Sequence, residues 1–208
     1  MILLSVLSLA VVVLAIWGFS LSRKANEKGK PTASTASTAP ATTVATLPEE
    51  AFVTFRDLET NFTIRYPRGW VRTEAPNREI RLQVTDGRQY AVRVQVRRTE
   101  VATTPANIGN LEPVMSGLVV GDSRVLSRDP VTINGLIGFR YIYTFLNEAG
   151  LEEAHVHYFL FQGHKLNSIV FAAPSSEFAR IEGVFDQMIN SFRSDPEPET
   201  TAPPTTTG

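Results

Sequence analysis

The chain has 208 residues, a formal net charge of −1 and no cysteine. Without cysteine it has no disulfide, no thiolate metal site and no lipid anchor of the kind attached to an N-terminal cysteine. The near balance of acidic and basic side chains, and the lack of any nucleic-acid-binding motif, argue against nucleic acid as a partner.

The N-terminal segment, residues 1–22, carries no charge and is almost entirely apolar. At about 1.5 Å per helical residue it is long enough to cross the roughly 30 Å hydrocarbon core of a bilayer. It lacks the basic start and the small-residue cleavage site of a secretory signal. We therefore predict an uncleaved transmembrane helix that anchors the protein in the cell membrane as a single-pass protein.

Residues 23–50 combine a basic flank with a tract rich in Thr, Ser, Ala and Pro, a composition that predicts a disordered linker. The flank, beginning with Arg23 and Lys24, favours a cytoplasmic domain by the positive-inside rule. The tract Pro31–Leu47 is instead typical of extracytoplasmic stalks. Both orientations stay open at this point, and we expect the domain to be extracytoplasmic.

Residues 51–194 hold most of the bulky apolar side chains and have the size of one domain, whereas residues 195–208 return to a Pro/Glu/Thr-rich composition typical of a disordered tail. Alternating patterns predict strands with one buried face, and three further runs are apolar on both faces, as in central strands covered from both sides. The alternating strands are 61–66, 80–84 and 90–96; the fully apolar ones are 138–146, 156–161 and 166–173, the last two linked through Gln162–Lys165.

Two segments are predicted to be helices that cover this sheet. Asn107–Val120 is the weaker, because it contains Pro113 and Gly117. Ser175–Phe192 has one apolar stripe at helical spacing, with Ser175 or Ser176 as the expected N-cap. The stripe comprises Phe178, Ile181, Phe185, Met188 and Phe192. The sequence therefore predicts an α+β fold: an antiparallel sheet with helices on both faces, an α/β/α sandwich.

The segment Asn61–Trp70 (NFTIRYPRGW) resembles the F-x-I-x-Y-P-x-G-W opening of PsbP-like domains, relatives of the Mog1 and DcrB proteins. The closing stretch is also similar, with Gly163–Lys165 in a hairpin, a strand ending at Ala172–Pro174, and a helix that runs into Ser191 and Phe192. The resemblance implies an α/β/α sandwich, usually extracytoplasmic in bacteria, that acts as a binding or assembly module. It implies no shared catalytic centre, so no functional residue is carried over.

A possible metal site lies on one strand. Glu153, His155 and His157 alternate and so share a face, and imidazole and carboxylate groups are zinc ligands. The competing interpretation is a polar row on a central strand that a helix edge covers.

A possible partner-binding surface is basic. Arg81, Arg93 and Arg97 are expected side by side on adjacent strands, where guanidinium groups could bind an acidic protein or an anionic envelope component. The competing interpretation is a solvated face that arginine keeps soluble.

No nucleophile elbow, phosphate-binding loop or dinucleotide fingerprint occurs in the chain, so we expect no enzymatic activity and no cofactor. The sequence favours a membrane-tethered, non-catalytic binding or assembly module of the cell envelope. The alternative is a metal-dependent enzyme that uses Glu153, His155 and His157.

Overall fold

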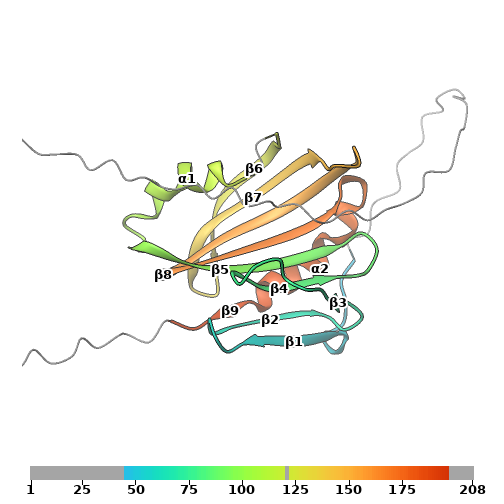
Figure 1. The fold of residues 1–208 in the computed structure, drawn as a ribbon, viewed down its shortest axis with the longest axis horizontal. Coiled ribbons are helices and arrows are strands. Elements are labelled where there is room, and N and C mark those ends of the chain that lie inside the picture. The colour runs from blue at the N-terminus through green and yellow to red at the C-terminus, as the bar shows by residue number, and fades with distance from the viewer. Residues whose placement is uncertain (1–44, 120–121, 197–208) are drawn as a thin grey trace, which may run out of the picture.

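The computed structural model describes residues 45–119 and 122–196, which form two antiparallel sheets and two α-helices (Figure 1). The small sheet has the order β1-β2-β9, with bounds Phe52–Asp57, Phe62–Pro67 and Arg193–Ser194. The large sheet has the order β3-β4-β5-β8-β7-β6. Its strands are β3 (Val71–Arg72), β4 (Ile80–Thr85), β5 (Ala91–Thr103), β6 (Arg124–Ile133), β7 (Leu136–Leu146) and β8 (Glu152–Pro174). The helices are α1 (Glu112–Gly117) and α2 (Phe178–Ser191), with short 3₁₀ turns at Glu49–Ala51, Ile108–Leu111 and Ser175–Glu177.

The longest strand, β8, folds back on itself at Gly163, whose φ is +57°. Its first half pairs with β7 and its second half pairs with β5. His157 Nε2 and Ser168 Oγ lie 2.7 Å apart across the two halves. This contact is impossible in a straight strand, because eleven residues of extended chain span about 36 Å. The two predicted strands, 156–161 and 166–173, are therefore confirmed as a hairpin at the centre of the large sheet.

One face of the large sheet, its first face, packs against α2 and the small sheet. The predicted stripe on α2 supplies this contact: Ile181, Phe185 and Met188 are buried. Trp70 lies between two aromatic rings, with 6.5 Å between ring centres to both Tyr90 and Phe185. The tryptophan that closes the opening motif thus packs against both sheet and helix.

The helix α2 begins later than expected. Ser175 and Ser176 lie within a 3₁₀ turn that follows the extended backbone of Pro174, and the residue before the helix is Glu177, whose side chain makes no capping bond. The predicted serine N-cap is therefore wrong. A serine caps a helix from extended backbone just before the first turn, and here both serines are already inside a turn.

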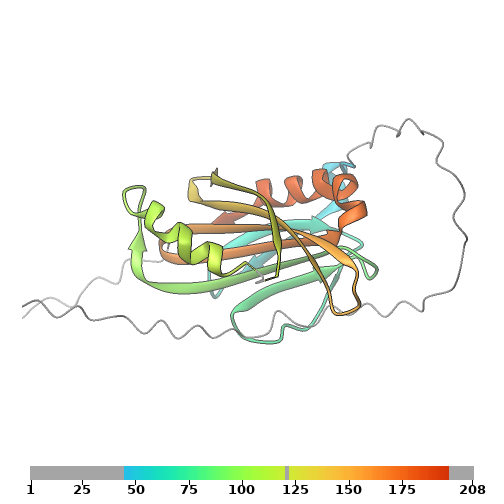
Figure 2. The same cartoon turned by 90° about the horizontal axis from the view of Figure 1, so that it is seen from above.

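Among the residues that the structure describes, only α1 and the 3₁₀ turn before it cover the opposite, second face of the large sheet, and they do so at one end (Figure 2). Met115 and Val119 pack there on a group of aromatic and aliphatic side chains: Phe139, Tyr141, Phe159, Phe161 and Leu166. The α+β fold with helices on both faces is confirmed. The expectation of a single sheet is wrong, because β1, β2 and β9 form a separate sheet. This small sheet and α2 both pack on the first face of the large sheet.

Residues 45–50, which the composition assigns to the linker, contact α2. The Ala45 amide donates to the Arg180 carbonyl at 2.9 Å, and the Leu47 amide donates to Gln187 Oε1 at 2.9 Å. The predicted transmembrane run, most of the linker and most of the tail lie outside the described residues. Within the described ranges, no helix is long and apolar enough to span a bilayer.

Candidate functional site

A row of polar side chains crosses the second face of the large sheet beyond α1. The strand register places them on one face, because residues directly opposite each other in a ladder share a side. Gln83 is opposite Arg93, Gln95 is opposite Ser168, and Tyr143 is opposite His155. We call this set the polar belt; its members are Gln83, Arg93, Gln95, Tyr143, His155, His157 and Ser168.

The two histidines of the polar belt are buried and differently bonded. His155 Nδ1 lies 3.2 Å from the Tyr143 hydroxyl, and its Nε2 lies 3.4 Å from Glu153 Oε2. Burial alone would raise the pKa of Glu153, but hydrogen bonds from His155 and Asn147 lower it. For His157, burial lowers the pKa to about 3, and the electrostatic effects of His155 and Arg93 act in the same direction. His157 is therefore neutral at physiological pH.

The hypothesis of a metal site at Glu153, His155 and His157 finds no support in this geometry. Glu153 and His155 contact each other, but His157 Nε2 is bonded to Ser168 Oγ. Across the described ranges 45–119 and 122–196, no three His, Asp or Glu side chains are grouped so that they could hold a metal ion.

Arg81 does not lie beside Arg93 and Arg97, so the expected row of three arginines is wrong. The register of β4 shifts between Ile80 and Leu82, which leaves Arg81 as the extra residue of a bulge. Its guanidinium binds the Asp57 carboxylate, 3.0 Å from Nε to Oδ2, and also binds Glu59. The hydrogen bonds that Arg81 donates to Asp57 and Glu59 raise its pKa. The guanidinium is thus engaged with the small sheet.

The Arg81–Asp57 pair predicts a pH-dependent part of the stability. Burial alone would raise the pKa of Asp57, but hydrogen bonds from Arg81 and Thr60 hold it below its ordinary value of 3.8. A carboxylate with a depressed folded-state pKa stabilises the protein above the unfolded pKa, and this stabilisation is lost as the pH falls through the folded-state pKa. We expect Asp57→Asn to lower the free energy of unfolding at pH 7 by about 1–2 kcal/mol and to flatten its decline below about pH 4. Urea unfolding at several pH values measures both effects; an unchanged acid profile in the variant would contradict the assignment.

The other two arginines remain on the second face and differ in their partners. Arg97 Nε lies 2.8 Å from Glu79 Oε2. Arg93 Nε donates to Gln83 Oε1 at 3.2 Å, and no carboxylate in the described part of the chain pairs with Arg93. Burial lowers the pKa of Arg93. The polar belt therefore contains a partly buried cation that no carboxylate of the described residues neutralises.

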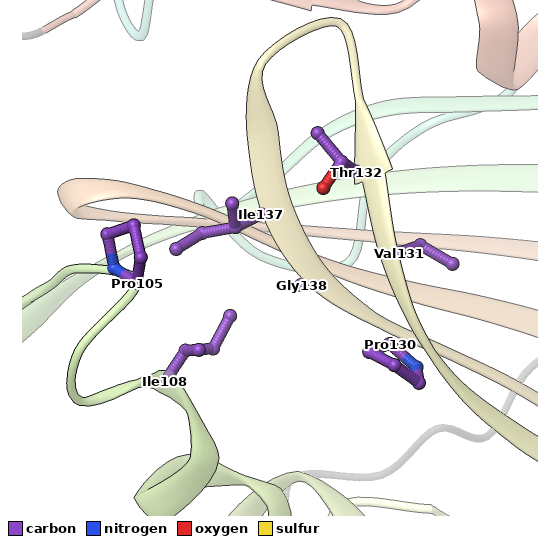
Figure 3. Close-up of a pocket in the computed structure, with 7 residues that line it drawn as sticks. All are labelled: Pro105, Ile108, Pro130, Val131, Thr132, Ile137 and Gly138. Atoms are coloured by element: carbon purple, nitrogen blue, oxygen red, sulfur yellow. The ribbon is translucent and has the colours of Figure 1, made fainter.

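A second candidate surface is an open apolar pocket of about 270 Å³ at the edge of the large sheet (Figure 3). Pro105 and Ile108 approach it from the segment before α1, and the β6–β7 hairpin forms the other wall. The strand β6 is the last strand of the sheet and, in the described ranges, pairs only with β7. We call the pocket and the free side of β6 together the edge groove; the pocket residues are Pro105, Ile108, Pro130, Val131, Thr132, Ile137 and Gly138.

The edge groove was not predicted because β6, the strand that forms one side of it, was not. That strand is exposed along most of its length, so it has no clear buried face and no regular alternation. The available signal was Asn134-Gly135, whose φ values of 51° and 84° form the tight turn between β6 and β7. Asn-Gly between two extended segments is a strong hairpin signal.

Comparison with solved structures relates this arrangement to known folds. CyanoP, the cyanobacterial PsbP of Synechocystis, superposes with a TM-score of 0.53 and 12% identity, over 76% of this chain and 100% of that one. The chain has a PsbP-like fold. The resemblance expected from Asn61–Trp70 is thereby confirmed at the level of fold.

Two further structures share the PsbP-like fold. LpqN, described as involved in cell envelope biogenesis of Mycobacterium tuberculosis, has a TM-score of 0.54 and 9% identity over 70% of this chain and 91% of its own. A Bacteroides thetaiotaomicron protein has a TM-score of 0.53 and 14% identity over 69% of this chain, which spans only 48% of that protein. No protein-family model and no curated protein matches the sequence.

Proposed function

We propose that the chain is a membrane-tethered, non-catalytic binding or assembly module of the cell envelope. The observation that carries this proposal is the edge groove, an open apolar pocket beside a strand that has a neighbour on one side only within residues 45–119 and 122–196. The PsbP-like fold, which LpqN shares, and the uncharged run of residues 1–22 support the envelope location and the tether. The expected partner is a protein of the envelope.

The edge groove combines two means of recognising an extended protein segment. The free side of β6 presents backbone amides and carbonyls that a further strand can pair with, and the pocket can take a side chain of that strand. Pro130 removes one backbone donor, and the register shift between Val125 and Ser127 interrupts the ladder. These two features limit indiscriminate pairing along β6, so that a partner must also fit the pocket.

The lining supports binding rather than chemistry. Of the seven pocket residues, only Thr132 has a polar side chain, and none is an acid, a base or a histidine. The buried histidines of the polar belt are bonded to Tyr143, Glu153 and Ser168 instead. We therefore propose that the protein is not an enzyme.

Site-specific photocrosslinking of the full chain in its native membrane tests this proposal. A photoreactive residue at Thr132, which is exposed in the edge groove, is expected to give one discrete protein adduct in the membrane fraction. Thr54, an exposed threonine on β1, is the matched control position and should give no such adduct. Pro105→Asp should abolish the adduct at Thr132, because a carboxylate is unfavourable in an apolar pocket.

Two outcomes would contradict the proposal. Equal adducts from Thr132 and Thr54 would show that the contact is not specific to the edge groove. If the Pro105→Asp chain, which should not bind the partner, stays in the membrane fraction after residues 2–22 are deleted, this segment is not the tether.

A further inference from the structure

The edge groove has a second side, on the first face of the large sheet, that its apolar pocket does not include. Pro130 and Thr132 line the pocket on the second face. Because side chains alternate along a strand, Asp129 lies on the first face, where the register places it directly opposite Arg140 of β7. Asp129 is exposed and makes no ion pair with any residue that the structure describes. Its carboxylate can therefore pair with a charge on a partner.

One side of α2 runs beside this part of the β6–β7 hairpin. Glu182, Asp186 and Asn190 are four residues apart and therefore share one side of the helix. Glu182 Oε1 lies 3.4 Å from Arg140 Nη2. At the other end of the row, the Asn190 carbonyl accepts a hydrogen bond from Asn134 Nδ2 at 3.0 Å. Because the hairpin contacts both ends of this row, Asp186 in the middle faces it as well, and the charge of Arg140 acts on its carboxylate.

Three carboxylates thus lie along this side of the edge groove, with one arginine, Arg140, among them. We call these carboxylates the acidic rim: Asp129, Glu182 and Asp186. Of the other arginines near the hairpin, Arg128 is on the second face, with its Nη1 2.8 Å from Glu112 Oε1 of α1. Arg193 donates to main-chain carbonyls at the end of α2, and Arg124 lies beyond the register shift of β6. The described residues therefore leave the acidic rim with an excess of negative charge.

A strand that paired with the free side of β6 would present its side chains alternately to the two faces of the sheet. Those on the second face would enter the apolar pocket, and those on the first face would lie beside Asp129 and α2. An apolar side chain beside Asp129 would remove water from the carboxylate without replacing it, and an acidic one would be repelled. A lysine or arginine would instead supply the missing counter-charge.

We propose that the edge groove selects an extended protein segment in which apolar side chains alternate with lysine or arginine. The apolar side chains fill the pocket, and the basic ones pair with the acidic rim. This inference rests on the proposed function and adds the chemistry of the partner. The competing role for Asp129 is that of a guard, because a charge on an edge strand also prevents strands from pairing indiscriminately.

Peptide binding to the full chain, held in nanodiscs of zwitterionic lipid, tests the inference. The probe is a short fluorescent peptide in which valine alternates with lysine, and two matched peptides carry glutamate or serine in place of lysine. Fluorescence anisotropy measures the affinity of each peptide. The lysine peptide is expected to bind about tenfold more tightly than either of the others, and its binding should weaken as salt is added.

Variants of the acidic rim locate the effect. Asp129→Asn should weaken binding of the lysine peptide about fivefold, because it removes the carboxylate nearest to the paired strand. Asp186→Asn, on α2, is a second variant and should weaken binding in the same direction. Glu148→Gln, the matched control, removes an exposed carboxylate from the β7–β8 turn and should stay within about twofold of the unaltered chain. Circular dichroism checks that each variant is folded.

The inference is overturned if no peptide binds, if the three peptides bind equally, or if neither variant of the acidic rim weakens binding of the lysine peptide. It is also overturned if Asp129→Asn makes the chain self-associate without any loss of peptide affinity, since Asp129 would then be a guard only.

Crosslinking in the native membrane separates this inference from the proposed function. The adduct from Thr132 should fall about fivefold in Asp129→Lys and stay unchanged in Glu148→Lys. An adduct that persists undiminished in Asp129→Lys overturns the charge selection but leaves the edge groove as the binding site. Absence of any adduct from Thr132 in the otherwise unaltered chain would contradict the proposed function itself, and this inference with it.

Discussion

Replacing Gly138 with alanine is expected to destabilise the protein by about 3 kcal/mol or more. A Cβ atom at this position would lie 1.9 Å from the backbone carbonyl oxygen of Phe159 and 3.1 Å from the Cα of Leu160. Both atoms belong to the main chain of β8, and Gly138 is paired directly with Leu160. The clash can be relieved only by moving the central ladder of the large sheet.

Urea unfolding followed by circular dichroism measures the effect. Gly117→Ala is the matched control, because nothing lies within 4 Å of the added Cβ atom and the residue is helical. We expect this control to be neutral or to stabilise the protein by up to about 1 kcal/mol, since alanine loses less backbone freedom than glycine on folding. Equal behaviour of the two variants would refute the close approach of β7 and β8.

Replacing Lys165 with methionine is the change with the second largest expected effect, a loss of about 2–4 kcal/mol. The Lys165 ammonium group is buried and donates to the Thr60 carbonyl at 2.8 Å, to Ser194 Oγ at 3.1 Å and to the Asp195 carbonyl at 2.6 Å. It thereby joins the large sheet to the β1–β2 turn and to β9. Methionine fills a similar volume but leaves these acceptors without their donor.

Two measurements separate this role from a general loss of charge. Amide hydrogen exchange in β9 and the β1–β2 turn should accelerate in Lys165→Met more than exchange in β7 does. Arg88→Met, which removes an exposed cation from the β4–β5 turn, should change the free energy of unfolding by no more than about 0.5 kcal/mol. Unchanged protection of β9 in Lys165→Met would contradict the proposed link.

The elements predicted from sequence are those in which at least one face is buried. Phe62, Ile64 and Leu82 alternate with polar residues and lie in the core, as their spacing indicates. The stripe of α2 is equally clear, because Phe185 and Met188 recur at helical spacing. In these segments the local pattern and the tertiary packing agree, so the sequence alone was sufficient.

The strands β1, β9 and β6 were harder to predict, because their side chains show little periodicity. Four of the first five residues of β1 are only partly buried or exposed, and β9 is just two residues long. Their pairing with β2 depends on contacts distant in sequence, such as Phe62 with Ser194. A single sequence carries no signal for such a register.

The candidate sites show the same limit. The shared face of His155 and His157 follows from their spacing of two in the sequence. The bulge at Arg81 cannot be predicted from spacing, and its one extra residue reverses which side chains of β4 share a face. The missing partner of Arg93 is likewise a tertiary property. Glu79 lies close to Arg97 only because the end of β4 is paired with β5.

The fold-back of β8 at Gly163 affects how the protein reaches its folded state. Residues 124–174 form a meander in which each strand segment pairs with its neighbour in sequence, through turns at Asn134-Gly135, at 147–150 and at Gly163. The junction with β5 instead pairs Ala91 with Ala172 and closes a long loop. Short loops close at a smaller entropic penalty than long ones. We therefore expect the meander to form first, as the folding nucleus, and β4 and β5 to dock on it afterwards.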